Sequence, residues 1–238
     1  MNNKIKIFLI AFFLICHTVF ASVEFDGVDD YVEVPHNSSL DGFTSMSIAA
    51  WVYPTTSGFG TLVSKYTEQG YIFYVGTATV KARLFLDAST PSNVDSNSFL
   101  TQNAWNHIVV SWNGSNASFY LNGIADGSPS ITSPGISDTG TLRIGINWFG
   151  FEAFTGLIDD VRIYNRALTS QEIANLYGSR SKYSSITSGL VGYWPMDDYP
   201  DGTTLTTEQK QKDRSGNGND GTPTNSPIQR ATTVLSYQ

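Results

Sequence analysis

Residues 156–178 read GLIDDVRIYNRALTSQEIANLYG, and this stretch carries the clearest structural signals in the chain. Its first part, GLIDDVRIY, is rich in β-branched and other apolar residues and predicts a buried strand. The second part contains the capping box TSQE at 169–172, whose side chains can satisfy free backbone N–H groups at a helix start. An apolar helix face follows, and Gly178 ends it. We therefore expect a strand followed by one short helix.

Upstream of this stretch, short apolar segments alternate with turn signals. VKARLFL (80–86) places Lys81, Arg83 and Phe85 on one face and four aliphatic residues on the other, which is the period of a half-buried strand. Further strand candidates are SVEF, DYVEV, SMSIAAWVYP, TLVSKY, GYIFYVG, WNHIVVSW, ASFYLNG and TLRIGIN. Asn-Gly pairs and Gly/Pro/Ser clusters separate them. Many short strands at regular spacing predict an all-β sandwich or barrel.

The character of the sequence changes after the helix. Residues 179–188 (SRSKYSSITS) predict a linker, and GLVGYWPMDD (189–198) predicts another strand. Residues 199–232 are poor in apolar side chains and rich in Thr, Asn, Gly and Asp, which indicates an extended loop or a partly disordered tail. About 50 residues is short for a domain that stands alone without a disulfide or a metal.

The amino-terminal residues 1–21 have the pattern of a secretory leader. A short basic start precedes the ten-residue apolar run 7–16, and Val19 and Ala21 then give the small-x-small pattern of a cleavage site. Ten apolar residues are too few to span a bilayer, which needs about 20. We expect a signal peptide that is cleaved after Ala21, so that the exported chain is not inserted in the membrane. An uncleaved membrane anchor is the alternative.

Charge and cysteine content narrow the classes of partner. The formal net charge is −7, and the predicted leader holds two of the lysines, so the exported chain is more acidic still. Such a chain should repel nucleic acid and anionic membrane surfaces. Cys16 is the single cysteine and lies in the leader, so a large core or a metal must replace disulfides.

Several motifs, taken together and in this order, resemble one family. The chain is similar to the laminin-G-like, concanavalin A-like jelly-roll superfamily over residues 22–178. The resemblance implies two antiparallel sheets packed face to face. It rests on SVEFDGVDDYVEVP (22–35), SMSIAAWVYP (45–54), WNHIVVSWNG (105–114), SFYLNG (118–123), LRIG (142–145) and the stretch at 156–178.

The resemblance also bears on residues 189–238. GLVGYWPMDD followed by a Ser-Gly-Asn-Gly-Asn run looks like the opening segment of such a domain, although here it follows the complete set of motifs. The chain either ends inside a truncated second repeat, which we favour, or is circularly permuted. In the permuted case the segment returns to the first domain and buries Tyr193 and Trp194 there.

Similar folds commonly hold a structural calcium at the rim of the sandwich, with carboxylates from the FDG and DDV motifs. Carried onto this sequence, the resemblance implicates Asp26 together with Asp159 or Asp160, with Asp29 and Asp30 as weaker candidates. Calcium takes about six to eight hard oxygen ligands, and clustered carboxylates supply them. A bound calcium would also relieve the repulsion between the two adjacent aspartates.

A second interpretation of the paired aspartates needs no metal. One of them can pair with Arg162 or Arg166 while the other caps a turn. Successive side chains of a regular strand face opposite sides. Asp159 and Asp160 can therefore reach one ion together only if a bulge redirects one of them.

The segment NWFGFEAF (147–154) concentrates aromatic residues between two strands. Aromatic rings in a loop suit the apolar face of a sugar, and nearby polar groups can bond its hydroxyls. The candidate ligand-contacting residues are Asn147, Trp148, Phe149, Phe151 and Glu152. The alternative is that these rings close one end of the sandwich, which we expect of Phe154.

Catalytic motifs are missing from the sequence. Retaining glucanases of similar fold carry paired carboxylates on one strand face, and no Glu-x-Asp-x-Glu occurs here. There is also no Gly-x-Ser-x-Gly motif and no phosphate-binding loop. We therefore expect a secreted, non-catalytic module that binds carbohydrate and holds a structural calcium. The rivals are a protein-binding adhesion module recognising an extracellular surface protein and, less favoured, a polysaccharide hydrolase.

Overall fold

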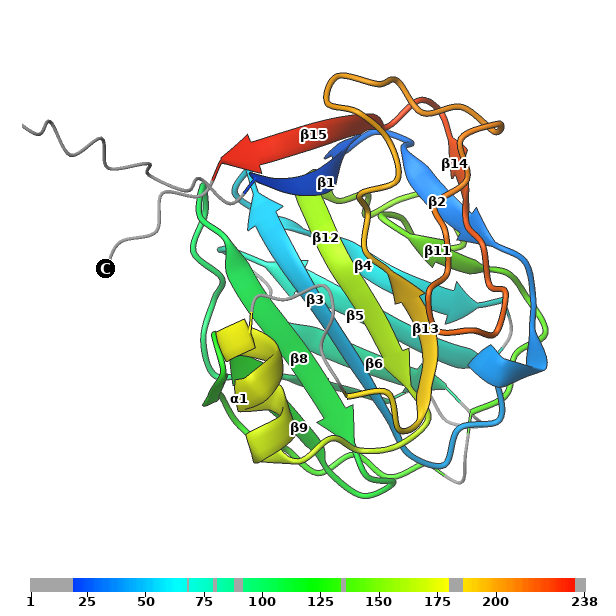
Figure 1. Ribbon diagram of the computed structural model, residues 1–238. Helices are drawn as coiled ribbons and strands as arrows, with labels where there is room; N and C mark the ends of the chain where they lie inside the picture. Colours follow the sequence, from blue (N-terminus) through cyan, green and yellow to red (C-terminus); the bar gives the residue numbers. More distant parts are fainter. Residues whose placement is uncertain are drawn as a thin grey trace, which may run out of the picture.

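The computed structural model is a sandwich of two antiparallel β-sheets packed face to face, with one α-helix among the described residues (Figure 1). It describes residues 19–233 apart from 68, 79–80, 88–91, 134–135 and 180–185. The predicted all-β jelly-roll sandwich with one short helix is confirmed.

The larger sheet, named sheet A here, has the order β10-β9-β8-β3-β12-β1-β15, and β13 also pairs with β12. Its strands are β1 (Val19–Asp26), β3 (Met46–Pro54), β8 (Asn106–Trp112), β9 (Ala117–Leu121), β10 (Ile124–Ala125), β12 (Thr155–Tyr164), β13 (Leu190–Trp194) and β15 (Ile228–Thr233). The other sheet, sheet B, has the order β14-β2-β11-β4-β5-β6-β7. Its strands are β2 (Tyr31–Val34), β4 (Phe59–Tyr66), β5 (Gly70–Gly76), β6 (Arg83–Asp87), β7 (Ser92–Asp95), β11 (Leu142–Ile144) and β14 (Thr222–Thr224). A short 3₁₀ turn, η1, covers Ser38–Leu40.

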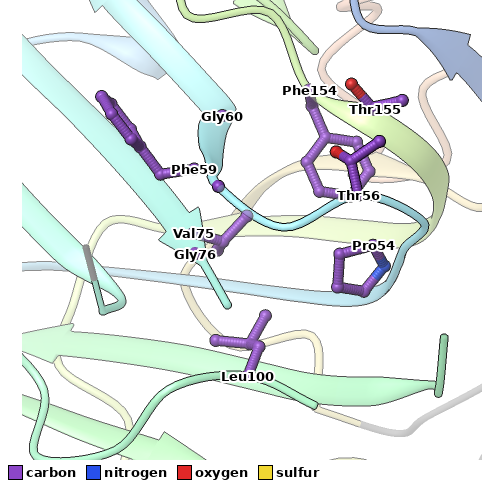
Figure 2. A pocket seen from close by; sticks show the side chains of 10 residues that line it. Pro54, Thr56, Phe59, Gly60, Val75, Gly76, Leu100, Phe154 and Thr155 are labelled. Atoms are coloured by element: carbon purple, nitrogen blue, oxygen red, sulfur yellow. The ribbon is translucent and has the colours of Figure 1, made fainter. Parts of the chain in front are cut away.

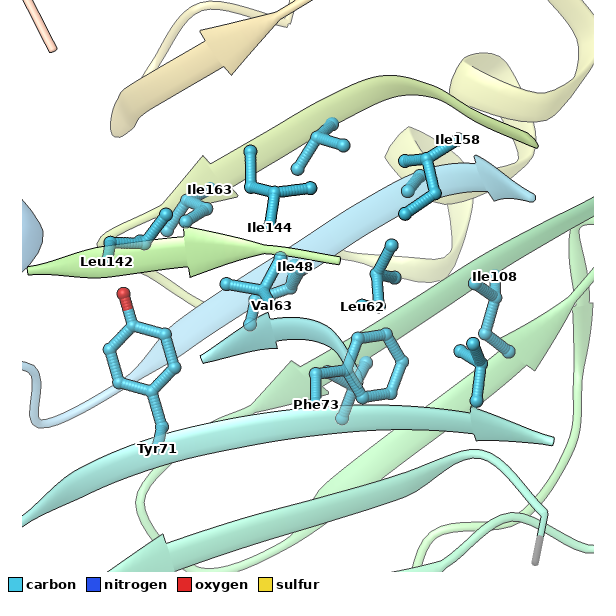
Figure 3. Packing of buried hydrophobic residues seen from close by; sticks show 14 of the residues in the cluster. Ile48, Leu62, Val63, Tyr71, Phe73, Ile108, Leu142, Ile144, Ile158 and Ile163 are labelled. Atoms are coloured by element: carbon cyan, nitrogen blue, oxygen red, sulfur yellow. The ribbon is translucent and has the colours of Figure 1, made fainter. Parts of the chain in front are cut away.

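The core lies between the sheets and is built by strand alternation. Ile48 of β3 and Ile158 of β12 point inward from sheet A, and Phe73 of β5 points inward from sheet B (Figure 3). Their neighbours on each strand face outward. The outer faces of both sheets therefore carry the side chains that are available for binding.

The helix α1 (Ser170–Ser179) lies on the outer face of sheet A, across β8 and β9 (Figure 1). Its predicted capping box is confirmed: the Glu172 N–H donates to Thr169 Oγ1 at 3.3 Å, and the Thr169 N–H donates to Glu172 Oε2 at 2.9 Å. Ile173 and Leu176 are buried against Val109 of β8. The helix therefore covers this part of the outer face of sheet A.

The carboxy-terminal segment forms part of the same sandwich. Strand β13 pairs with β12, β14 with β2, and β15 with β1. Trp194 is fully buried, and its Nε1–H donates to the Asn219 carbonyl at 2.8 Å. Residues 189–233 thus take the arrangement of the returning-segment alternative, in which Tyr193 and Trp194 are buried, rather than that of a separate repeat.

The expectation of an extended loop at 199–232 holds for residues 199–221, which contain no helix or strand, but not for the residues that follow. The region as a whole contains β14 and β15 and buries Leu205 and the polar side chains Gln211 and Gln229. The strands are short and polar because much of their stability comes from pairing with β1 and β2. Such pairing leaves little apolar signal in the sequence.

Two predicted segments fall partly outside the described residues. Residues 1–18 of the expected leader lie outside the described residues. Strand β1 begins at Val19, which pairs with Thr233. Residues 180–185 of the expected linker are also outside, and α1 reaches Ser179. Within the described part of the chain, no helix has the length and apolar character needed to cross a bilayer.

Candidate functional site

The loop between β11 and β12 presents three aromatic rings to solvent. Trp148, Phe149 and Phe151 are 40%, 56% and 57% exposed, respectively, although exposed rings of this size are costly in water. We call residues 147–152 the aromatic loop. Its exposed rings are those that the sequence singled out.

A buried amide holds the aromatic loop in shape. Asn147 is 1% exposed, and its Nδ2–H donates to Glu152 Oε2 at 2.8 Å. Its Oδ1 accepts from the Phe151 N–H at 3.2 Å, and Gly150 provides the left-handed turn with φ of 76°. Asn147, expected to contact ligand, is instead a scaffold residue, because its amide is committed within the loop.

Two rings of sheet B extend the surface that the loop begins. Phe149 stacks on Phe151 with centroids 5.5 Å apart, and it also meets Tyr66 of β4 at 5.9 Å. Tyr66 in turn packs edge-on against Phe85 of β6 at 5.4 Å. We call Tyr66, Phe85, Trp148, Phe149 and Phe151 the aromatic platform. The sequence places Phe85 on the polar face of its strand, which was a signal for this role, whereas Tyr66 gave none.

Charged residues border the platform. On one side, the Arg143 guanidinium lies 4.7 Å from the ring centroids of both Tyr31 and Trp148, and Arg143 Nη1 donates to the Trp148 carbonyl at 3.2 Å. On the other side, Arg83 binds Asp95 through two hydrogen bonds. The platform therefore combines flat apolar rings with charged and polar groups at its edge.

A hollow at the end of the sandwich is too small for a sugar. It is lined by Pro54, Phe59, Val75, Leu100 and Phe154, among others, and Phe154 projects toward it in Figure 2. Its volume of about 20 Å³ leaves room for roughly one water molecule. Phe154 is 3% exposed and belongs to the core, so the expectation that it closes one end of the sandwich is confirmed.

The turn between β1 and β2 gathers three carboxylates. Ligand oxygens of Asp26, Asp29 and Asp30 lie within 4.8 Å of one another. The turn is tight, because Asp26 Oδ1 accepts from the Val28 N–H at 2.8 Å, and at Gly27 a Cβ would lie 1.9 Å from Thr155 Oγ1. We call residues 26–30 the acidic turn.

The acidic turn fits a hard divalent cation. Asp30 is 5% exposed, its Oδ1 is buried without a hydrogen-bond partner, and its Oδ2 accepts from the Asp26 N–H at 3.1 Å. Burial, reinforced by the carboxylates of Asp26 and Asp29, raises the pKa of Asp30 to about 6 despite that hydrogen bond. Calcium bonds oxygen at about 2.3–2.6 Å, so oxygens less than 4.8 Å apart can share one ion.

Asp159 and Asp160 are not part of the acidic turn. Asp26 pairs with Thr155, which lies four positions before Asp159 on β12. The register therefore places Asp26 and Asp159 about 13 Å apart along the strand direction. At the bulge between β12 and β3, Asp160 has a φ of 53° and its Oδ1 accepts two hydrogen bonds from Arg162. The predicted set Asp26, Asp159 and Asp160 is thus split, and the Arg162 alternative describes Asp160.

The model of the concanavalin A-like lectin/glucanases superfamily, in its laminin-G type, matches residues 26–174. The chain belongs to this superfamily. The match spans the acidic turn and the aromatic loop, and it ends within α1. Superfamily membership accounts for the two-sheet architecture.

The chain is similar to part of a receptor in sequence and to two solved structures in fold. The chain is 28% identical over 151 residues to the Adhesion G-protein coupled receptor V1 of Danio rerio, which is 58% of this chain and 2% of the receptor. A Bacteroides ovatus protein proposed to bind carbohydrate superposes with a TM-score of 0.69 at 20% identity, covering 91% of this chain and 62% of that one. Domain 4 of AbnA, an arabinanase from Geobacillus stearothermophilus solved with arabinotriose, gives 0.52 at 21% identity, covering 66% and 76%. At these identities the two structures establish the fold.

Proposed function

We propose that the chain is a non-catalytic module that binds polysaccharide or cell-surface glycan outside the cell membrane. The observation that carries the proposal is the aromatic loop, which holds Trp148, Phe149 and Phe151 exposed on a rigid support. A structure that keeps large apolar rings in water without a covering element usually uses them for binding. The relatives support the same class, since one is proposed to bind carbohydrate and another was solved with arabinotriose.

The platform would bind sugar through ring stacking. The exposed faces of Phe149 and Phe151 would meet the apolar C–H faces of pyranose or furanose rings. One face of Trp148 is covered by Arg143, so the other face is the one offered to ligand. Polar groups at the border, such as the Glu152 carboxylate, would accept hydrogen bonds from sugar hydroxyls.

Replacing Trp148 with Ala should lower the affinity for the bound glycan about tenfold or more, because the variant loses the stacking contact of the indole ring. A tenfold loss corresponds to about 1.4 kcal/mol of binding free energy. The double variant Phe149→Ala/Phe151→Ala should weaken binding at least as much. Glycan-array binding followed by titration calorimetry measures both effects. A matched control is Tyr177→Ala, since Tyr177 is 37% exposed on α1, over the other sheet. Equal losses in the control and the platform variants would count against the assignment.

We further propose that calcium binds the acidic turn and fixes its geometry without touching the sugar. Asp26, Asp29 and Asp30 would be the carboxylate ligands, with the buried Oδ1 of Asp30 as the innermost donor. Extracellular modules of this kind bind calcium at about 0.1–1 mM. A divalent ion would neutralise the three carboxylates and tie the end of β1 to the start of β2.

About 10 mM calcium should raise the melting temperature by roughly 5 °C, since an ion bound at these affinities adds about 1.5–3 kcal/mol. In Asp30→Asn this rise should disappear, because the buried ligand oxygen loses its charge. Without calcium the variant should be at least as stable as the parent at neutral pH, because the mutual repulsion of the carboxylates is reduced. Calorimetric melting in EDTA, calcium and magnesium tests this, with Asp220→Asn as the control. A full calcium shift in Asp30→Asn would reject the site.

Export is part of the same proposal. The leader predicted at residues 1–21 would direct the chain across the membrane, and cleavage after Ala21 would release it. The chain spans only 2% of the receptor it resembles, so that receptor's own activity is not carried over.

Adhesion to another protein is the second candidate, and the similarity to an adhesion receptor favours it. In that case the platform would form the centre of a protein interface, where aromatic residues and arginine dominate. The glycan array separates the two candidates. Binding to no glycan, together with a partner protein whose capture requires Trp148, would support adhesion.

A further inference from the structure

The arginines beside the aromatic platform are already engaged by carboxylates. Arg83 donates from Nε to Asp95 Oδ1 at 2.5 Å and from Nη2 to Asp95 Oδ2 at 2.9 Å, so the pair is bidentate. Arg143 Nε donates to Glu33 Oε2 at 3.0 Å, and the rings of Tyr31 and Trp148 lie against its guanidinium group. Each of these two guanidinium groups therefore already has a carboxylate partner.

Two further carboxylates on this face form no ion pair among the described residues, although Glu152 also acts electrostatically on Arg83. Asp87 accepts a hydrogen bond from the Tyr66 hydroxyl at 3.0 Å, and Glu152 accepts one from Asn147 at 2.8 Å. The remaining nearby cation, Lys81, has its ammonium group 5.7 Å from the centre of the Phe99 ring. On this face, therefore, both guanidinium groups are paired with carboxylates, and Asp87 and Glu152 add further negative charge.

We propose, on the basis of the proposed glycan binding, that the platform selects uncharged glycans, and that Asp95 and Glu33 exclude acidic glycans by occupying Arg83 and Arg143. A sugar carboxylate or sulfate must displace a protein carboxylate from its guanidinium before it can bind. It must also approach Asp87 and Glu152, which repel it. A neutral sugar meets neither cost, because its hydroxyls can donate to the same carboxylates. The discrimination thus comes from unfavourable contacts with the wrong ligand as well as favourable contacts with the right one.

The test compares ligands that differ only in charge. Linear arabinan and laminarin serve as neutral probes, and their carboxymethylated forms serve as acidic ones. The parent chain should bind a neutral form at least about tenfold more tightly than its carboxymethylated form, a difference of about 1.4 kcal/mol. Binding is measured by titration calorimetry and affinity electrophoresis at constant calcium and at two salt concentrations.

The double variant Asp95→Asn/Glu33→Gln should reverse the exclusion. Both replacements keep the side-chain shape and a hydrogen-bond acceptor, so the arginines stay in place but are no longer neutralised. Affinity for the carboxymethylated forms should rise about tenfold and fall again with added salt, as expected for newly available charges. Affinity for the neutral forms should change by less than about twofold. Asp220→Asn, which frees Lys212 in an ion pair of the carboxy-terminal segment, is the matched control and should gain nothing.

The outcomes separate this inference from the function on which it rests. Equal binding of neutral and acidic forms by the parent, or no gain in the double variant, overturns the inference and leaves glycan binding intact. If the parent binds no neutral form in a Trp148-dependent way, the proposed function fails and the inference fails with it. Should the double variant fold poorly by circular dichroism, Asp95→Asn alone repeats the measurement at the bidentate pair.

Discussion

A chain that ends at Ser188 is expected not to fold into a cooperative structure. It would lack β13, β14 and β15, and the β12 residues that pair with β13 would become an open edge. Trp194, Met196 and Leu205, each 0% exposed, would leave the core. Removal of one large buried side chain costs about 3–5 kcal/mol, whereas a whole domain is stable by only about 5–15 kcal/mol.

Near-ultraviolet circular dichroism and urea unfolding of the shortened chain test this expectation. Two tryptophans give a graded version of the experiment in the full chain. Trp194→Ala should lower the free energy of unfolding by about 3–5 kcal/mol, whereas Trp148→Ala, at 40% exposed, should lower it by less than about 1 kcal/mol. A shortened chain that melts as cooperatively as the full one would show that residues 189–233 are dispensable for the fold.

Replacing Arg162 with Met is expected to destabilise the protein by about 3–5 kcal/mol, because it removes the cation that is paired with the poorly solvated carboxylate of Asp160. Arg162 is 2% exposed, and its Nη2 lies 2.9 Å from Asp160 Oδ1. The same guanidinium lies 4.3 Å from the ring centre of Tyr193, so the replacement also removes a contact between β12 and β13. Urea unfolding at neutral pH gives the change in free energy.

Charge coupling predicts that a second replacement restores part of this loss. In Arg162→Met/Asp160→Asn the negative charge at position 160 is removed as well, so the double variant should be more stable than Arg162→Met alone. The more exposed pair Arg166–Glu172 serves as a control. Glu172→Gln should lower the free energy of unfolding through loss of the helix cap, and loss of the ion pair should add less than about 1 kcal/mol to that. Strictly additive effects at 160 and 162 would show that the ion pair contributes nothing of its own.

Sequence patterns predicted the features that depend on neighbouring residues. Strand alternation located the core faces, and the Thr169–Glu172 capping box located the helix start. The three exposed rings of the aromatic loop followed from their position between strands. Asp29 and Asp30 lie within four positions of Asp26, so their clustering was local as well, although they were ranked below Asp159 and Asp160.

Features that depend on strand register or on pairing between distant segments could not be predicted from the sequence. The pairing of Asp26 with Thr155 separates Asp26 from Asp159, and a strand alignment of this kind leaves no mark in composition. Tyr66 joins the platform only because β4 passes beneath the aromatic loop. Asn147 looked like a ligand group because a polar residue among aromatic ones suggests binding, yet its amide is used to hold Glu152 and Phe151.

The pairing of β1 with β15 has a consequence for the order in which the protein is made. Gln229 Nε2 donates to the Ser22 carbonyl at 2.8 Å, across 207 positions of the chain. During synthesis, one side of β1 and the open side of β12 therefore remain unpaired until strands about 200 and 30 positions later, respectively, have been made. Contacts so distant in sequence form slowly, because a long loop must close before they contribute. The nascent chain thus carries unpaired strand edges until β15 has been made, and β1 can pair on that side only then.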